Sequence, residues 1–265
     1  GILLCKLNAI GADESVTKWF SSYISYRKQF VSINGSVSSS ESVTCGVPQG
    51  SILGPLLFTI YVNDMVRSVN CDLYLYADDS ALLVSGKKVS QIEAALSENM
   101  TSLSQWLVMN RLSLHLGKTE SILFGTKQKI KQCSQMSVYC NDIPIQAKKN
   151  VKYLGITFDQ DLSGDKIGRD AVRKINNGLK FLYRNGQLLS RNEKRLLCST
   201  LLQPYFDYAC VSWYWGINKY RNRLQTAQNK MVRYTLALHP RAHVGADQLV
   251  LLKWLDVSSN VEFLA

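Results

Sequence analysis

Two adjacent aspartates, Asp78 and Asp79, stand between two apolar segments and are the residues best suited to chemistry. The flanking segments, Leu73–Ala77 and Ser80–Val84, have the length and composition of β-strands. A strand-turn-strand would hold both carboxylates at its tip. Carboxylate oxygens are ligands that Mg²⁺ prefers, and phosphoryl-transfer sites use such cations. Adjacent aspartates also serve as simple turn formers, so the pair alone leaves both interpretations open.

A segment rich in glycine and proline precedes the aspartates. Cys45–Phe58 contains three glycines and two prolines and leads into a predicted helix, 50–66. Such a backbone turns tightly and lets another molecule approach closely. The free N–H groups of a helix N-terminus also attract phosphate groups. A plain turn has the same composition, so this segment alone does not identify a binding site.

The elements around these two segments follow from hydrophobic periodicity and turn residues. We expect further helices over 13–26 and 89–110, strands over 29–33, 121–124 and 151–158, and a loop over 36–42. Hairpin turns are expected at Asn34-Gly35 and Asn141-Asp142. Beyond residue 165 the pattern becomes mainly helical, with helices predicted over 170–183, 192–202 and 221–236.

Positive charge is concentrated late in the chain. The formal net charge is +11, and 166–235 alone contains 14 Lys and Arg against three acidic residues. Residues 1–95 carry seven basic and eight acidic groups and are nearly neutral. A polyanion such as nucleic acid would suit the basic part. A solvated basic helix face has the same composition and remains the alternative.

Several classes of protein are disfavoured by composition. Seven cysteines are an odd number and form no C-x-x-C pair, so we expect ordinary reduced thiols. His115, His239 and His243 lack the spacing of zinc ligands. No signal peptide or uninterrupted membrane-spanning segment is visible, which predicts an intracellular chain without a membrane partner.

The glycine- and proline-rich segment and the Tyr76-Ala77-Asp78-Asp79 block, in this order, resemble polymerase motifs of reverse transcriptases, in particular of jockey-like non-LTR retrotransposons. The resemblance covers nearly the whole chain. It extends to the following segments: Ile2–Leu7, Arg27–Gln29, Tyr61–Asp64, Trp106–Leu114 with Lys118, Lys152–Ile156 and Trp213–Gly216.

The resemblance implies an RNA-directed DNA polymerase that joins deoxynucleoside triphosphates to a DNA primer on an RNA template. It implies an α+β fold, with a partial right-hand polymerase palm (an antiparallel sheet with packed helices) over residues 1–165 and a basic, mainly helical thumb-like region over 166–265. A nuclear location also follows from the family alone.

The family's site residues map onto this chain one by one. Asp78 and Asp79 would be catalytic and would bind Mg²⁺ or Mn²⁺, and Lys118 would assist the leaving pyrophosphate. The resemblance further implies a nucleotide and template site at Pro48, Gln49, Gly50 and Ser51, and a primer site at Tyr153, Leu154 and Gly155.

The sequence also departs from the family pattern. The family's other metal-binding aspartate and its fingers would precede residue 1, so we expect a fragment that is inactive on its own. His115 stands where relatives often have asparagine. The alternative function is a catalytically inactive, nucleic-acid-binding remnant of a retrotransposon, which the basic helices would support equally well.

Overall fold

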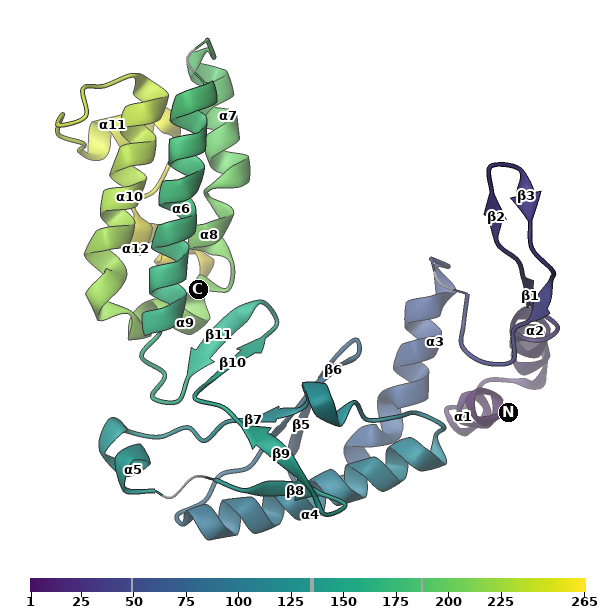
Figure 1. Ribbon diagram of the computed structural model, residues 1–265. Helices are drawn as coiled ribbons and strands as arrows, with labels where there is room; N and C mark the ends of the chain where they lie inside the picture. Colours follow the sequence, from purple (N-terminus) through teal and green to yellow (C-terminus); the bar gives the residue numbers. More distant parts are fainter. Residues whose placement is uncertain (49, 134–135, 187) are drawn as a thin grey trace. The chain divides into compact units, whose positions relative to one another are not determined.

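The computed structural model describes residues 1–48, 50–133, 136–186 and 188–265 and combines helices with short, mainly antiparallel strand pairs (Figure 1). The expected mixture of helices and antiparallel strands is therefore confirmed. The chain divides into two compact units: unit 1 holds residues 1–119 and 137–145, and unit 2 holds 120–136 and 146–265. The functional boundary at residue 165 stays a prediction.

Three helices form the N-terminal part of unit 1: α1 (Ile2–Ala9), α2 (Glu14–Ile24) and α3 (Leu53–Val62). Leu3, Leu7 and Leu57 are buried where they pack together. The predicted helix over 13–26 is confirmed as α2. The helix predicted over 50–66 is shorter than expected, because α3 begins only at Leu53 and continues after Val62 as the 3-10 helix η1 (Asn63–Ser68).

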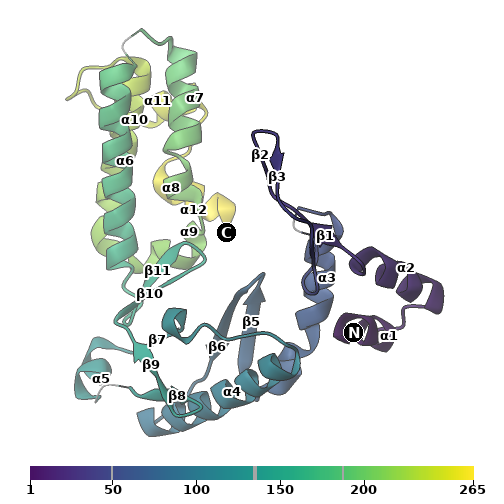
Figure 2. The same cartoon turned by 45° about the vertical axis from the view of Figure 1, so that its right-hand side comes forward.

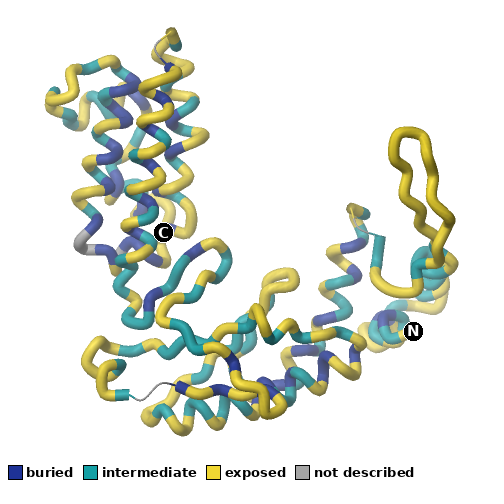
Figure 3. The backbone as a smooth tube through the Cα atoms, in the orientation of Figure 1, coloured by how far each residue is buried: buried dark blue, intermediate teal, exposed yellow. Residues whose placement is uncertain are grey.

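Short, exposed strand pairs connect α2 to α3 (Figure 3). Strand β1 (Lys28–Gln29) pairs with β4 (Glu41–Ser42), and β2 (Ser32–Ile33) pairs with β3 (Ser36–Val37). The loop predicted over 36–42 is confined to 38–40, because both of its ends form strands, and the strand predicted over 29–33 is interrupted. Asn34 and Gly35 both have positive φ, so the turn directs the serine-rich backbone back onto the preceding strand.

The acidic pair lies between β5 (Asp72–Tyr76) and β6 (Asp79–Leu83), an antiparallel hairpin that packs against η1 and α4 (Val89–Met109) (Figure 2). Both strands and the helix agree with the sequence prediction to within one residue at each end. Leu73, Leu75 and Leu82 pack against a buried cluster. This cluster is built by Val62, Met65, Val69, Leu103, Trp106 and Leu107.

Strand β8 (Val138–Cys140) and the first three residues of β9 (Ile143–Ala147) complete unit 1. They form the hairpin predicted at Asn141-Asp142. The N–H of Tyr139 donates to Ser97 Oγ of α4 at 3.0 Å, and the N–H of Ser137 donates to Glu93 Oε1 at 2.7 Å. Helix α4 is thus a scaffold for two hairpins, β5–β6 and β8–β9.

Unit 2 begins with small elements. Strand β7 (Glu120–Ser121) pairs in parallel with the last two residues of β9 and covers only the start of the strand predicted over 121–124. Helix α5 (Lys127–Gln132) follows. The single strand predicted over 151–158 was wrong, because it is a hairpin of β10 (Asn150–Tyr153) and β11 (Ile156–Asp159). Leu154 and Gly155 have positive φ and reverse the chain there.

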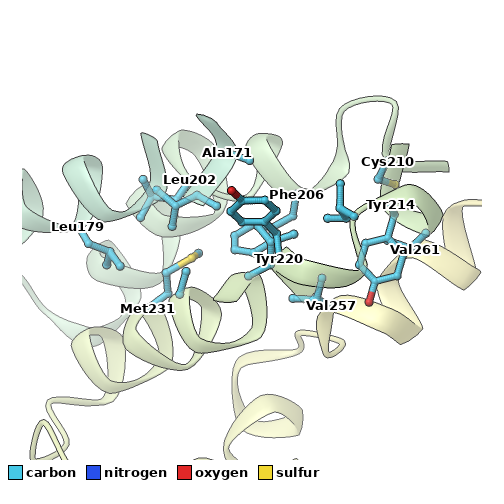
Figure 4. Close-up of a cluster of buried hydrophobic side chains, with 14 of the residues drawn as sticks. Ala171, Leu179, Leu202, Phe206, Cys210, Tyr214, Tyr220, Met231, Val257 and Val261 are labelled. Carbon is cyan, nitrogen blue, oxygen red and sulfur yellow. The ribbon is translucent and has the colours of Figure 1, made fainter. Parts of the chain in front are cut away.

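The rest of unit 2 is helical among the described residues. Helices α6 (Asp165–Asn185), α7 (Arg191–Leu201) and α10 (Asn218–Leu236) confirm the three predictions. They surround one apolar core with the following shorter elements: α8 (Pro204–Asp207), α9 (Cys210–Trp213), η3 (Tyr214–Gly216) and α12 (Val257–Leu264). Helix α11 (Ala246–Leu252) lies between α10 and α12 in the sequence. Figure 4 shows Leu202, Phe206, Tyr220 and Met231 in this core. Throughout the described stretches, no helix has the length and apolarity needed to cross a membrane.

Candidate active site

A two-residue turn holds the acidic pair in unit 1. Tyr76 and Asp79 are cross-strand partners that close the β5–β6 hairpin, and Ala77 and Asp78 form its turn. Hairpin turns of this length require positive φ at their first central residue, and Ala77 has a φ of 52°. A residue with a Cβ pays about 1–2 kcal/mol in this region. The hairpin therefore maintains a strained residue directly before Asp78.

The two faces of the hairpin differ in burial. Successive residues of a strand point to opposite faces, and cross-strand partners share a face. Leu73 and Leu75 face the core of unit 1. Tyr74 and Tyr76 lie on the other face and are 54% and 65% exposed. Asp79, the partner of Tyr76, therefore lies on the solvent face, beside two largely exposed aromatic side chains.

Both carboxylates are exposed, and among the described residues neither takes part in a hydrogen bond or ion pair. Two free carboxylates on a rigid turn fit a hard divalent cation, which is commonly held by one or two carboxylates, water and substrate phosphates. Within the same residues, no cluster of three or more His, Cys, Asp or Glu could hold a metal ion by itself. The donor set thus suits a cation that shares its ligands with a substrate.

The glycine- and proline-rich segment forms a tight turn before α3. The Ser51 hydroxyl donates to the carbonyl of Pro48 at 2.7 Å and accepts the N–H of Gly54 at 3.0 Å. A Cβ on Gly54 would lie 3.2 Å from Ser51 Oγ, so this position has little room for a side chain. Gly50 has a φ of 78°, a conformation that glycine adopts without strain. Gln49 lies outside the described residues.

Two basic residues, to which the sequence assigned no role, stabilise the backbone before and after α3. The Arg27 guanidinium donates to the carbonyls of Cys45 and Gly46 and so fixes the approach to the turn. Lys6 Nζ reaches Asp64 Oδ1 at 2.5 Å and the carbonyl of Tyr61 at 2.6 Å, at the far end of α3. Such partners lie far apart in the sequence, so no local pattern could reveal them.

Lys118 ends the short 3-10 helix η2 (Leu116–Lys118) in unit 1 and is exposed. Its backbone N–H donates to the carbonyl of His115 at 2.9 Å, which fixes the backbone of the turn. In the described residues, no hydrogen bond or ion pair links Lys118 to either aspartate or to the turn before α3. The structure therefore brings Asp78 and Asp79 together and leaves the role of Lys118 a prediction.

Tyr153, Leu154 and Gly155 belong to unit 2 and form the β10–β11 turn. Tyr208, in the loop after α8, donates its hydroxyl to the carbonyl of Leu154 at 2.6 Å. A Cβ on Gly155 would lie 3.3 Å from the Tyr208 ring, so the ring packs closely on the turn. This support was not predictable from the sequence, because β11, α6, α7 and α8 separate the two residues along the chain.

Comparison with known proteins connects these features to one family. A family model described as reverse transcriptase (RNA-dependent DNA polymerase) matches residues 2–158. The chain is 25% identical over 221 residues to a probable RNA-directed DNA polymerase from transposon X-element of Drosophila melanogaster. It is 26% identical over 223 residues to the RNA-directed DNA polymerase from mobile element jockey of the same organism.

These alignments cover 80% of this chain but only 24% of each of those two relatives. A further relative, the Retrovirus-related Pol polyprotein from type-1 retrotransposable element R1 2 of Nasonia vitripennis, is 26% identical over 205 residues. That alignment covers 72% of this chain and 48% of the relative. The chain therefore spans about a quarter of the length of the first two proteins.

Proposed function

This chain belongs to the reverse transcriptase (RNA-dependent DNA polymerase) family, and from that membership we propose that it carries part of the active site of an RNA-directed DNA polymerase of a non-LTR retrotransposon. The proposed reaction joins a deoxynucleoside triphosphate to the 3′-hydroxyl of a DNA primer on an RNA template. The observation that carries the proposal is the β5–β6 turn, which presents Asp78 and Asp79 on a solvent face.

We propose that Asp78 and Asp79 hold divalent metal, Mg²⁺ or Mn²⁺, with substrate phosphates and water as further ligands. Bound in pairs, such cations stabilise both the attacking and the departing oxygen of a phosphoryl transfer. The protein's part is to fix the carboxylates: the hairpin register sets Asp79, and the strained turn at Ala77 sets Asp78.

The other predicted residues receive roles by family resemblance. Pro48, Gln49, Gly50 and Ser51 would shape the nucleotide and template site, where backbone N–H groups before α3 attract phosphate. Lys118 would neutralise or protonate the leaving pyrophosphate as a mobile cation. The β10–β11 turn at Tyr153–Gly155 would position the primer end, with Tyr208 stabilising the turn. Residues 1–165 would form the palm and 166–265 the thumb.

The test is primer extension on an RNA template with Mg²⁺, using the longest open reading frame that contains this sequence. We expect Asp78→Asn to lower the extension rate by more than about a hundredfold, because even loss of an outer-shell partner costs 10–100-fold. Asp72→Asn is the matched control, an exposed aspartate of the same hairpin at the other end of β5. It should change the rate by less than about twofold.

A rate for Asp78→Asn equal to that of the wild-type protein would end the catalytic assignment. Mn²⁺ binding, followed by proton relaxation, gives a second readout and should weaken in Asp78→Asn but not in Asp72→Asn. A second candidate function is nucleic-acid binding without catalysis. The basic surface of α6, described below, favours it, and retained binding with no extension by any form of the protein would support it.

A further inference from the structure

A groove on unit 2 is lined by residues of α6, of the C-terminal end of α7 and of α8. Figures 1 and 2 show the ribbons of these helices. Its volume is about 360 Å³. Its lining includes Lys174, Asn177, Gly178, Phe181, Leu201 and Tyr205. We call it the aromatic groove. It belongs to unit 2, whereas the acidic turn belongs to unit 1.

The aromatic groove exposes apolar side chains that a soluble surface would ordinarily cover. Phe181 is 61% exposed, Leu201 51% and Tyr205 38%. Leu202 is buried beneath them, and a Cβ on Gly178 would lie only 2.4 Å from its side chain. The absence of a side chain at Gly178 therefore lets α6 and the end of α7 come close, so that Phe181 and Tyr205 border a shared hollow.

A row of cations runs beside this groove. Lys166, Arg169, Arg173, Lys180 and Arg184 are exposed and recur at three- and four-residue steps, with Asn177 filling the one gap. We call this row the basic stripe. It lies opposite the buried face of α6 and is about 27 Å long at 1.5 Å per residue. Asp170, the one acidic residue between Lys166 and Arg184, is paired with Arg173 at 2.8 Å.

Lys174 links the groove to the stripe. Its ammonium lies 5.3 Å from the ring centroid of Tyr205, a cation–π contact that holds positive charge at the edge of the groove. A partner in the groove therefore meets exposed rings on one side and the basic stripe, interrupted only at Asn177, on the other. Such a surface matches a molecule with flat apolar faces joined by a polyanionic backbone.

We propose that the aromatic groove binds an unpaired stretch of nucleic acid, with bases stacked on Phe181 and Tyr205 and phosphates on Lys174 and the basic stripe. Bases in a single strand expose their faces, whereas those inside a duplex are stacked on each other and cannot enter the groove. A protein partner would need strong acidity to meet this charge. The proposal does not depend on the catalytic role of Asp78 and Asp79.

The test uses the full chain in EDTA and fluorescence anisotropy of labelled oligothymidylate and of a blunt duplex of equal length. We expect Phe181→Ala to weaken single-strand binding at least about fivefold, as loss of one stacked base does, and to leave duplex binding unchanged. Phe181→Trp retains a ring and should retain affinity. Phe263→Ala is the matched control, because Phe263 is 78% exposed on α12 outside the groove.

Lys174→Gln is the second variant, which keeps the test decisive if Phe181→Ala fails to fold. It should lower the slope of log affinity against log salt by about 0.7, the loss of one phosphate contact in a single strand. Unchanged single-strand affinity in both variants, an equal loss for duplex, or an equal loss in Phe263→Ala would overturn the proposal. Altered self-association with unchanged oligonucleotide binding would assign the groove to a second copy and overturn it too. The assay contains EDTA and no deoxynucleoside triphosphate, so its outcome does not depend on whether Asp78 and Asp79 catalyse polymerisation, and Asp72→Asn should bind as the wild-type protein does.

Discussion

Ala77 determines how the acidic turn can be built, because it occupies a conformation that favours glycine. Its φ of 52° is required for a two-residue hairpin turn, and its small side chain keeps the cost low. A β-branched residue is a genuine outlier at positive φ. The position thus tolerates few side chains for a reason that lies in the backbone alone.

We therefore expect Ala77→Val to destabilise the hairpin by about 1–2 kcal/mol relative to Ala77→Gly, since only the valine variant increases the strain. Amide hydrogen exchange of β5 and β6 measures this difference directly. Ala81→Val is the control, because Ala81 lies within β6 and valine favours strands. Equal exchange rates in Ala77→Val and Ala77→Gly would contradict the argument.

At the scale of elements, Lys6 joins three helical segments of unit 1. Its ammonium bonds Asp64 of η1 and the carbonyl of Tyr61 in α3, and it lies 4.9 Å and 4.7 Å from the ring centroids of Tyr61 and Trp106. The Tyr61 hydroxyl donates to the carbonyl of Asn110 at 2.6 Å, just after α4. One largely buried cation therefore fixes α1, α3 and α4 around the hairpin that carries the aspartates.

Lys6→Met keeps most of the aliphatic packing but removes the charge. We expect it to lower the free energy of unfolding of unit 1 by about 1–3 kcal/mol, because hydrogen-bonded groups lose their partner. Lys18→Met is the matched control, since Lys18 pairs with Glu14 on an exposed helix surface. It should cost less than about 1 kcal/mol. Equal losses of stability in urea unfolding would show that the Lys6 contacts contribute no more than a surface ion pair.

The same elements show how far sequence reasoning reaches. Strands β5 and β6 were predictable because an apolar pattern flanks a pair of aspartates, and α4 and α6 because their periodicity is long. The β10–β11 hairpin was missed because Leu154 is a non-glycine residue at positive φ, which has no strong turn signal. Pairing of Ser36–Val37 was missed because serine favours loops unless a turn such as Asn34-Gly35 positions it. Lys6 and Asp64 were beyond reach, because only the tertiary fold brings them together.

At the scale of the whole molecule, the two units have separate apolar cores that differ in size. The buried clusters of unit 1 are small and surround α3 and α4. Unit 2 has a larger continuous cluster, which joins residues of α6, α7, α10 and α12. Stability grows with the apolar surface removed from water, so we expect the helical part of unit 2 to resist denaturant better than unit 1.

Native thiols can report each unit separately. Cys140 is 1% exposed in unit 1, and Cys198 is fully buried in unit 2. Burial raises the pKa of the Cys198 thiol to about 11, so the folded protein holds almost no thiolate there at pH 8. Unfolding restores the ordinary pKa and the reactivity. Because folding raises this pKa, the contribution of the protonated Cys198 thiol to folding stability is fully present below the pKa of the thiol in the unfolded chain. That contribution is lost as the pH rises toward about 11.

We expect iodoacetamide at pH 8, read by peptide mass spectrometry along a urea gradient, to modify Cys140 at lower urea than Cys198. The exposed Cys5 and Cys45 should react without urea and serve as internal controls. Repeating the gradient at pH 10 should move the Cys198 transition to lower urea, because folding then opposes thiolate formation. Coincident transitions of Cys140 and Cys198 would mean that the two cores unfold as one cooperative system, and the division into units would then have no thermodynamic counterpart.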